Sequence, residues 1–277
     1  MSVTVISEPP QAAPPAPAMR IRKPVEEWRV TGIVAPLVVV AVLLGGWEVT
    51  SQFVSPVLIS SPQKVAVELV DLFRQGTATA ALRISLRELY IGMAIGIAAG
   101  IVLGVLVGRY SLVDSVFAPF INAANATPLN VLIPLLIVWV GISAKARILF
   151  VVLISFFPVL LNTAGGLRNV SRGYVEVGRM MGLSERQLLV KVILPGSVPY
   201  IFAGVRLGVA LGVIGMIVGE MEVSNVGLGY LLNFYGEGFE TGKLIALVFV
   251  ASLIGVVNVM IVRGIQLRWF RWIHAAR

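Results

Sequence analysis

The chain has 277 residues, of which 57% are hydrophobic and 13% are charged. Soluble domains usually carry about 25% charged residues, so the composition excludes an ordinary soluble domain and indicates a membrane protein. The formal net charge is +8, but the basic residues are spread between long apolar segments, which argues against nucleic-acid binding. The absence of cysteine excludes disulfides and thiolate metal sites, and the single histidine, His274, lies in the basic C-terminal tail. We expect neither a metal nor a cofactor in this chain.

The N-terminal segment is rich in proline and alanine over residues 1–18 and has no apolar periodicity. We therefore expect residues 1–30 to form a disordered cytoplasmic tail. The apolar run that follows, from Thr31 to Gln52, is preceded by basic residues as in a signal peptide. It is too long for a signal peptide and further apolar segments follow, so we expect it to be the first transmembrane helix.

Apolar windows with the length that crosses a bilayer, about 20 residues, recur along the chain and predict six transmembrane helices. The third window contains Pro119, Pro128 and Pro134, so we expect a broken helix whose irregular backbone faces protein or water. Between the first two windows, apolar residues at helical spacing predict an amphipathic helix over 62–76 at the extracytoplasmic membrane surface. The six windows are 32–51, 84–108, 117–140, 148–166, 199–221 and 244–263.

The distribution of lysine and arginine predicts the orientation, because basic residues are retained on the cytoplasmic side. With both termini inside, the inner segments hold 14 basic residues and the outer segments 7, which leaves Arg206 within a span. The five tryptophans lie at predicted span ends, where their rings favour the membrane interface. We therefore expect both termini to face the cytoplasm, with a basic cytoplasmic tail over 268–277.

Two of the predicted spans carry stripes of glycine. Small residues at such spacing let another helix approach closely, which is a main source of helix association in lipid. We expect these stripes to pack helices within the chain, and contact with another subunit is the alternative. The glycines are Gly92, Gly96, Gly100, Gly104 and Gly108 in the second span and Gly204, Gly208 and Gly212 in the fifth.

Charged and polar residues inside the predicted spans are the candidates for a transport pathway. Arg206 and Glu220 lie in the fifth span, where ionisable groups are costly and usually functional. Arg206 can instead reach the lipid headgroups or form a structural ion pair. Our candidate pathway residues are Asn122, Asn125, Thr127, Asn130 and Glu220. Helix capping and hydrogen bonding between helices are the alternative role for each of them.

The longest cytoplasmic segment, residues 168–198, contains more than a connecting loop. Apolar and charged residues at helical spacing predict two short helices that are broken at Gly182. Ser184 has the position of an N-cap for the second of these helices. Met181, Leu188 and Val192 are expected on one face, where they would offer an apolar knob to the cytoplasm.

At these residues the sequence resembles the permeases of binding-protein-dependent ABC importers. Their loop carries Glu-Ala-Ala, three residues, Gly, nine residues and then Ile-x-Leu-Pro, and Val177, Gly178 and Val192 replace the two alanines and the isoleucine here. The resemblance extends over about residues 60–271 and is greatest to the nitrate, sulfonate, taurine and bicarbonate branch. The matching loop residues are Glu176, Gly182, Leu194 and Pro195.

The resemblance implies an all-α membrane helix bundle of the type I ABC importer permease fold over residues 31–267, located in the bacterial inner (plasma) membrane. It also implies that the cytoplasmic loop docks on a separate ATPase. Because proline lacks a backbone donor, Pro195 is expected to end the docking helix before the fifth span. The residues assigned to this coupling are Glu176, Gly182, Leu183, Ser184, Arg186, Leu194 and Pro195.

No nucleotide-binding motif GxxxxGK[ST] and no catalytic constellation occurs in the sequence. We therefore expect a non-catalytic permease, with ATP and magnesium bound by two partner ATPase subunits. The resemblance further implies an extracytoplasmic substrate-binding protein, a second permease copy, surrounding membrane lipid, and a small anion such as nitrate, a sulfonate, taurine or bicarbonate as substrate. The alternatives are a secondary transporter driven by an ion gradient and a membrane scaffold without transport.

Overall fold

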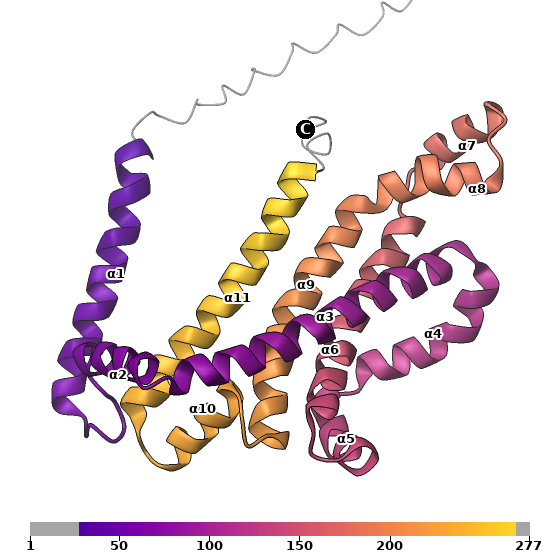
Figure 1. Ribbon diagram of the computed structural model, residues 1–277. Helices are drawn as coiled ribbons and strands as arrows, with labels where there is room; N and C mark the ends of the chain where they lie inside the picture. The colour runs from indigo at the N-terminus through magenta and orange to yellow at the C-terminus, as the bar shows by residue number, and fades with distance from the viewer. Residues whose placement is uncertain (1–27, 270–277) are drawn as a thin grey trace, which may run out of the picture. The chain divides into compact units, whose positions relative to one another are not determined.

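The computed structural model describes residues 28–269, and every regular element in that part of the chain is a helix (Figure 1). The chain divides into two units, residues 1–46 and 47–277, and each is described by itself. The first unit contains most of α1 (Trp28–Phe53), whose N-terminal half includes Pro36. The predicted tails lie outside the described residues, apart from the few at their inner ends.

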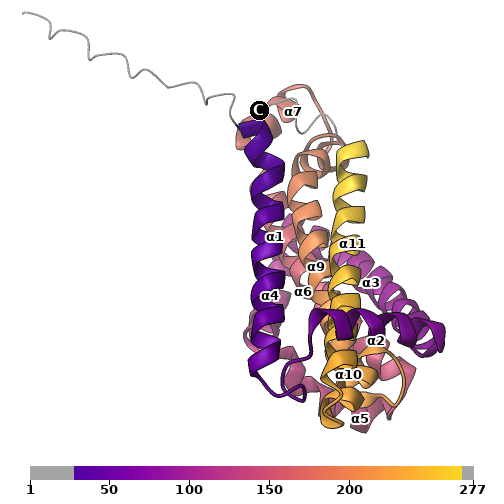
Figure 2. The ribbon, with the colours of Figure 1, turned by 90° about the vertical axis from the view of Figure 1, so that its left-hand side faces the viewer.

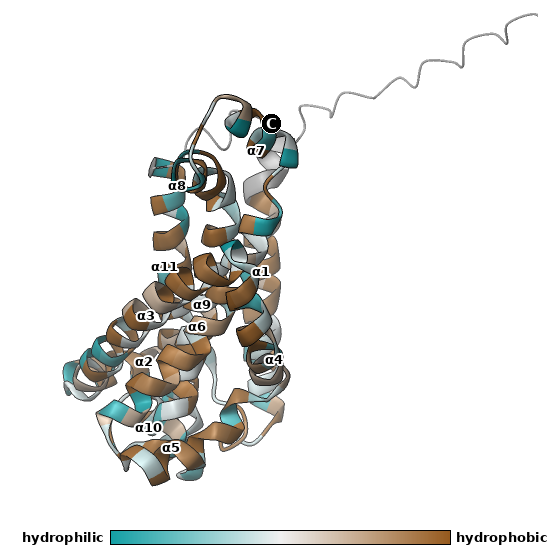
Figure 3. Ribbon diagram, turned by 90° about the vertical axis from the view of Figure 1, so that its right-hand side faces the viewer, coloured by the Kyte–Doolittle hydropathy of each residue, from teal (hydrophilic) through white to brown (hydrophobic). Residues whose placement is uncertain are grey.

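Five helices of the described part are long and apolar enough to cross a membrane, and a bent pair of shorter helices makes six if it counts as one span. This result confirms the predicted polytopic helical protein. Figure 3 shows that apolar residues dominate along α6 and α9. The five helices are α1, α3 (Thr77–Arg109), α6 (Ala144–Arg168), α9 (Leu194–Val223) with the short elements before it, and α11 (Thr241–Trp269).

The predicted break in the third span is confirmed. α4 (Ser111–Ala126) and the segment formed by η1 (Leu129–Leu132) and α5 (Ile133–Val140) meet at a bend of 91°. Thr127 is extended, as expected for a residue that precedes a proline, and Pro128 follows it at the break. The other two prolines of this region lie within α4 and in the first turn of α5, so Pro128 is the one at the bend.

α6 lies at the centre of the second unit, with α3 and α9 packed along it. The glycine stripes make this close packing possible. A Cβ atom at Gly96 would lie 2.6 Å from the carbonyl oxygen of Val152, and one at Gly208 would lie 2.8 Å from that of Ser155. All eight glycines of the two predicted stripes face α6 in this way. The structure therefore uses both stripes for packing within the chain.

The amphipathic helix predicted between the first two spans is present as α2 (Pro62–Arg74), and Ser61 caps its N-terminus. Its apolar face meets protein, because Val65 and Leu72 are buried where α2 packs on α11 and α3. Figure 2 shows α2 lying across α11. The prediction that this face rests on the membrane surface is therefore wrong for its buried part. α11 is distant from α2 in the sequence, so periodicity alone did not reveal it as a covering helix.

A short helix that the sequence analysis did not predict, α10 (Leu228–Glu237), connects α9 to α11. It packs against both of these helices and against α3. Leu228 is fully buried, and Leu231, Leu232 and Tyr235 join the same core cluster. α10 thus closes the end of the bundle opposite to the loop of residues 168–198 (Figure 1).

Candidate functional site

The loop of residues 168–198 forms α7 (Arg172–Met180), α8 (Glu185–Leu188) and a π-helical turn, η2 (Leu189–Ile193), that leads into α9. The predicted break at Gly182 is present, with a φ of +76° that favours glycine. The predicted N-cap is also present. Ser184 Oγ accepts a hydrogen bond from the backbone nitrogen of Gln187 at 3.3 Å, and the Gln187 side chain accepts one from Ser184 nitrogen at 2.9 Å.

The inner face of this loop is a small apolar core. Leu188 is fully buried there and packs with Leu167, Ile193 and Leu183. A Cβ atom at Gly178 would lie 2.7 Å from the Cδ1 atom of Leu188. Glycine in place of the alanine of the family pattern therefore makes room for Leu188, and the loop is a packed unit.

The outer face of α7 carries the apolar surface of the loop. Tyr174, Val177, Met180 and Met181 are exposed, with Met180 at 85% and Met181 at 77% of their full exposure. The predicted face of Met181 with Leu188 and Val192 is wrong, because the turn at Gly182 separates Met181 from Leu188. We call these four exposed residues the α7 stripe; the helical spacing of the first three could have revealed it in the sequence.

Two sets of ion pairs tie the loop to the neighbouring helix ends. Glu185 at the start of α8 pairs with Arg109 at the end of α3 and, at 3.4 Å, with Arg179 of α7. Arg168 at the end of α6 pairs with Asp114 of α4 at 2.6 Å. Arg109 and Glu185 are 76 residues apart and Asp114 and Arg168 are 54 apart, so composition and spacing did not predict these two pairs. Glu176 and Arg186, which the resemblance assigns to coupling, are exposed.

Pro195 does not end the docking helix, contrary to the prediction. The helix runs from Glu185 through the π-helical turn to Val223. The backbone nitrogen of Leu194 donates to the carbonyl oxygen of Leu189, five residues earlier. A π turn shifts the hydrogen-bond register by one residue, which accommodates the missing donor of a proline without ending the helix. α8, the π-helical turn and α9 therefore form one continuous helix.

Two of the predicted pathway residues line a hollow of about 240 Å³ at the break of the third span. Thr127 and Asn130 face it together with Leu129 of η1, while Pro158 of α6 and Leu211 of α9 are among the residues that form the other walls. Among the other candidates, the Asn122 side chain is exposed on α4 and does not line this hollow, and the side chain of Asn125 lies outside the described residues.

Glu220 lies inside the helical packing and not on an open face. Its Oε2 atom accepts hydrogen bonds from Ser85 Oγ at 2.9 Å and from the backbone nitrogen of Gly229 at 2.8 Å. Ser85 Oγ in turn accepts from the backbone nitrogen of Leu228 at 2.9 Å. The first N–H groups of a helix have no partner within it and favour a negative charge. Glu220 thus fixes the start of α10 against α3, and a Cβ atom at Gly227 would collide with its carboxylate.

A buried ion pair that the sequence analysis missed lies close enough to Glu220 for the charges to interact. Arg147 of α6 donates to both carboxylate oxygens of Glu88 on α3, at 2.7 and 2.6 Å. Both side chains are buried. Glu88 is an acidic residue within the second predicted span, and an acidic residue at such a position indicates that a buried partner exists. Arg147 directly precedes the predicted fourth window, 148–166, and is one of the seven basic residues that the sequence analysis assigns to outer segments; in the structure it lies within α6.

Arg206 is partly buried on α9 and makes no ion pair or hydrogen bond with any other described residue. It lies in the N-terminal half of α9, 12 residues after Leu194, the first residue of that helix. The structural ion pair considered for it is therefore not formed within the described part of the chain.

Comparisons with known proteins identify the family of the chain. The family described as binding-protein-dependent transport system inner membrane component matches residues 96–272. A putative aliphatic sulfonates transport permease of Escherichia coli (strain K12) is 34% identical over 90% of this chain and 95% of its own length. A formylaminopyrimidine transport permease of Halalkalibacterium halodurans is 29% identical over 79% of this chain and 88% of its own length.

The fold is also found in solved structures. The methionine ABC transporter in an inward-facing conformation contains a chain that matches with a TM-score of 0.57 at 20% identity, covering 69% of this chain and 97% of that one. These matches confirm the predicted resemblance and the helical permease fold. The chain therefore belongs to the family of binding-protein-dependent transport system inner membrane components, the permease subunits of ABC importers.

Proposed function

We propose that two copies of this chain form the translocation pathway for a small solute and that two ABC ATPase subunits dock on the loops of residues 168–198. The observation that carries this proposal is the α7 stripe. It presents four exposed apolar side chains on a loop that is otherwise packed, capped and ion-paired. An exposed apolar surface supported by a rigid element is typical of a protein interface.

The loop is built to pass movement into the membrane. Force on α7 reaches α8 through the turn at Gly182 and the packing of Leu188. From α8 it passes to α9 along a continuous helix, and to α3 through the ion pair of Glu185 with Arg109. In this proposal, closure of the two ATPases on ATP moves α9 and α3 as rigid bodies and changes the side on which the pathway is open. The exposed Glu176 and Arg186 lie beside the docking surface.

A charge in the α7 stripe is expected to prevent docking without unfolding the loop. Replacing Met180 with aspartate buries an uncompensated charge at the interface, and we expect the amount of ATPase that co-purifies to fall at least about tenfold. Met180→Leu keeps the surface apolar and should co-purify normally. Normal co-purification of Met180→Asp would show that the ATPase docks elsewhere. The thermal stability of the isolated permease should be unchanged in both variants because Met180 is exposed.

The pathway in this proposal passes the hollow at the break of the third span, where Thr127 and Asn130 provide neutral polar groups. Neutral hydrogen-bonding groups can guide a solute without holding it as tightly as an opposite charge would. The second copy would close the open side of the hollow, and Asn122 and Asn125 of α4 would lie along its approach. Glu220 is left out of the pathway because its side chain is buried in the packing.

We further propose that both termini and the loop of residues 168–198 face the cytoplasm, where the basic residues predominate. An extracytoplasmic binding protein would then deliver the solute at the α10 end. The proposed substrate is an anion of the sulfonate, taurine, nitrate or bicarbonate type. The similarity to the putative sulfonate permease of Escherichia coli supports this proposal. The formylaminopyrimidine permease shows that similar chains serve other solutes, so the test includes several solutes.

The function is tested by reconstitution into liposomes with candidate ABC ATPase and binding-protein subunits from the same organism. We expect uptake of one of the labelled solutes, namely an alkanesulfonate, taurine, nitrate or bicarbonate, only when ATP and all subunits are present. Uptake by the permease alone under a proton or sodium gradient would overturn the proposal in favour of a secondary transporter. If ATP drives uptake of a neutral solute and of none of these anions, the chain is still an importer permease, but the proposed anionic substrate is wrong.

A further inference from the structure

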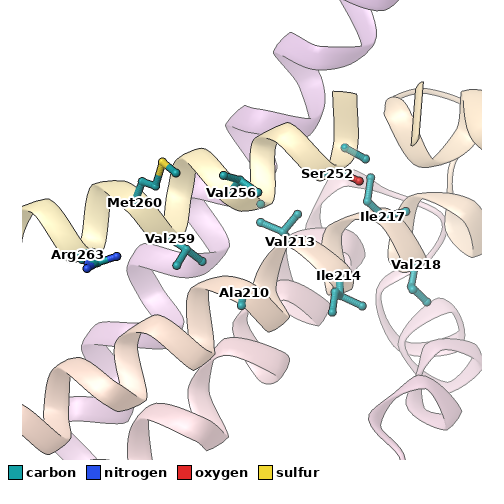
Figure 4. Close-up of a pocket in the computed structure, with 12 residues that line it drawn as sticks. Ala210, Val213, Ile214, Ile217, Val218, Ser252, Val256, Val259, Met260 and Arg263 are labelled. Carbon is teal, nitrogen blue, oxygen red and sulfur yellow. The ribbon is translucent and has the colours of Figure 1, made fainter. Parts of the chain in front are cut away.

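We propose that the groove between α9 and α11 is a binding site for one anionic phospholipid, with the lipid phosphate held by Arg206 and Arg263. The groove has a volume of about 630 Å³ (Figure 4), and Ile214 lines both this groove and the hollow at the break of the third span. Its walls are almost entirely aliphatic, and Arg263 is the charged residue among those that line it. The lining residues used below are Ala210, Val213 and Ile217 of α9 and Ser252, Val256 and Val259 of α11.

The register of the two helices brings a second arginine to the same end. α9 and α11 run in opposite directions (Figure 1). In the groove Ile217 lies across from Ser252, Val213 from Val256 and Ala210 from Val259, as Figure 4 shows. Each turn backward along α9 is thus matched by a turn forward along α11. One more turn places Arg206 on the same face of α9, opposite Arg263.

These two guanidinium groups have no acidic partner in the described part of the chain. A cationic pair at one end of an apolar groove is complementary to an anion that also carries apolar surface. Arginine binds phosphate through several parallel hydrogen bonds, and basic pockets between transmembrane helices bind lipid headgroups. The charge of the groove therefore complements a lipid phosphate.

The length of the groove distinguishes a lipid chain from a transmembrane helix. From Ser252 to Arg263 the axis of α11 rises by roughly 16 Å, at about 1.5 Å per residue. This is about half of the hydrocarbon core, which is about 30 Å thick. One leaflet, with a headgroup at one end and an acyl chain in the groove, fits that length. A helix that packed along the groove would extend over the full thickness.

The openness of the groove agrees with an exchangeable lipid. Ile214, Val256 and Met260 are exposed along its rim. At its floor the two helices are in ordinary contact, since a Cβ atom at Gly255 would lie 3.9 Å from Val213 Cγ1. An acyl chain can therefore enter sideways from the bilayer. The headgroup lies level with Arg206 and Arg263, toward the C-terminal end of α11.

The site is tested with the full-length permease by native mass spectrometry after exchange with phosphatidylglycerol or phosphatidylcholine. We expect one phosphatidylglycerol to be retained in preference to phosphatidylcholine. In the Arg206→Gln/Arg263→Gln variant this preference should fall by about 25-fold, at roughly fivefold for each arginine. Arg268→Gln removes an exposed arginine from the same end of α11 and should retain the preference. Equal lipid preference in the double variant and the unmodified chain would overturn the proposal.

A second measurement locates the lipid and excludes the other occupants. Phosphatidylglycerol with a photoreactive group in its acyl chain should label peptides that contain Val256 and Met260 in the membrane-embedded permease. Val256→Trp fills the groove without changing its charge, and it should remove this labelling. If a second copy of the chain or another of its helices covers the groove, labelling of these peptides is absent, and the lipid site is rejected.

Discussion

Gly96→Val is expected to abolish the close packing of α3 on α6 and to be among the most destabilising single changes in the chain. The new Cβ atom would lie 2.6 Å from the carbonyl oxygen of Val152 and 3.2 Å from Ser155 Cβ. A backbone oxygen inside a helix cannot move aside as a flexible side chain can, so the helices must separate. We expect a loss of at least about 3 kcal/mol, which is at the upper end for overpacked sites.

The measurement is thermal or denaturant unfolding of the purified permease, followed by the loss of monodisperse protein on size exclusion. Gly264→Val in α11 is the matched control, because a Cβ atom at Gly264 would meet no atom within 4 Å. Valine at an open position of a helix is slightly better than glycine, so this control should be neutral or mildly stabilising. Equal stability of the two variants would contradict the packing of the glycine stripe against α6.

The membrane helices, the broken span, the helix cap and the glycine turn could be predicted because each depends on residues close together in the sequence. Span length predicted the membrane helices, and the prolines near Thr127 predicted the broken span. The glycine stripe that includes Gly96 predicted a close helix contact but not its partner, since α6 carries no matching signal. The Ser184 cap and the turn at Gly182 were predicted because capping and a left-handed conformation depend on residues only a few positions apart.

The features that the sequence did not reveal depend on partners distant in the chain. Glu88 meets Arg147 across 59 residues, and Ser85 meets Glu220 across 135. A charge inside a span indicates that some partner exists, but its identity follows only from the packing of α3, α6 and α9. Pro195 illustrates a different limit. Proline predicts the loss of one hydrogen bond, yet the π-helical turn before it allows the helix to continue, and no residue pattern predicts that turn.

The buried pair of Glu88 and Arg147 is expected to show the second large effect. Arg147→Met leaves the Glu88 carboxylate buried without its partner and near Glu220, so two carboxylates would share one apolar region. Removal of one member of a buried pair usually costs 3–5 kcal/mol, so we expect a loss of about 4 kcal/mol in unfolding free energy. The measurement is the shift of the unfolding midpoint of the permease in detergent.

The double variant Glu88→Leu/Arg147→Met separates the energy of the pair from the penalty of a lone charge. Both charges are then replaced by apolar side chains of similar length, and buried pairs replaced in this way are often neutral or stabilising. We therefore expect the double variant to recover most of the stability that Arg147→Met loses. Lys243→Met breaks the more exposed pair with Glu240 and should cost at most about 1 kcal/mol. If the double variant is as unstable as Arg147→Met, the loss arises from the shape of the arginine and not from an unpaired Glu88. In that case the ion pair does not hold α3 against α6, and the glycine stripe alone would account for their contact.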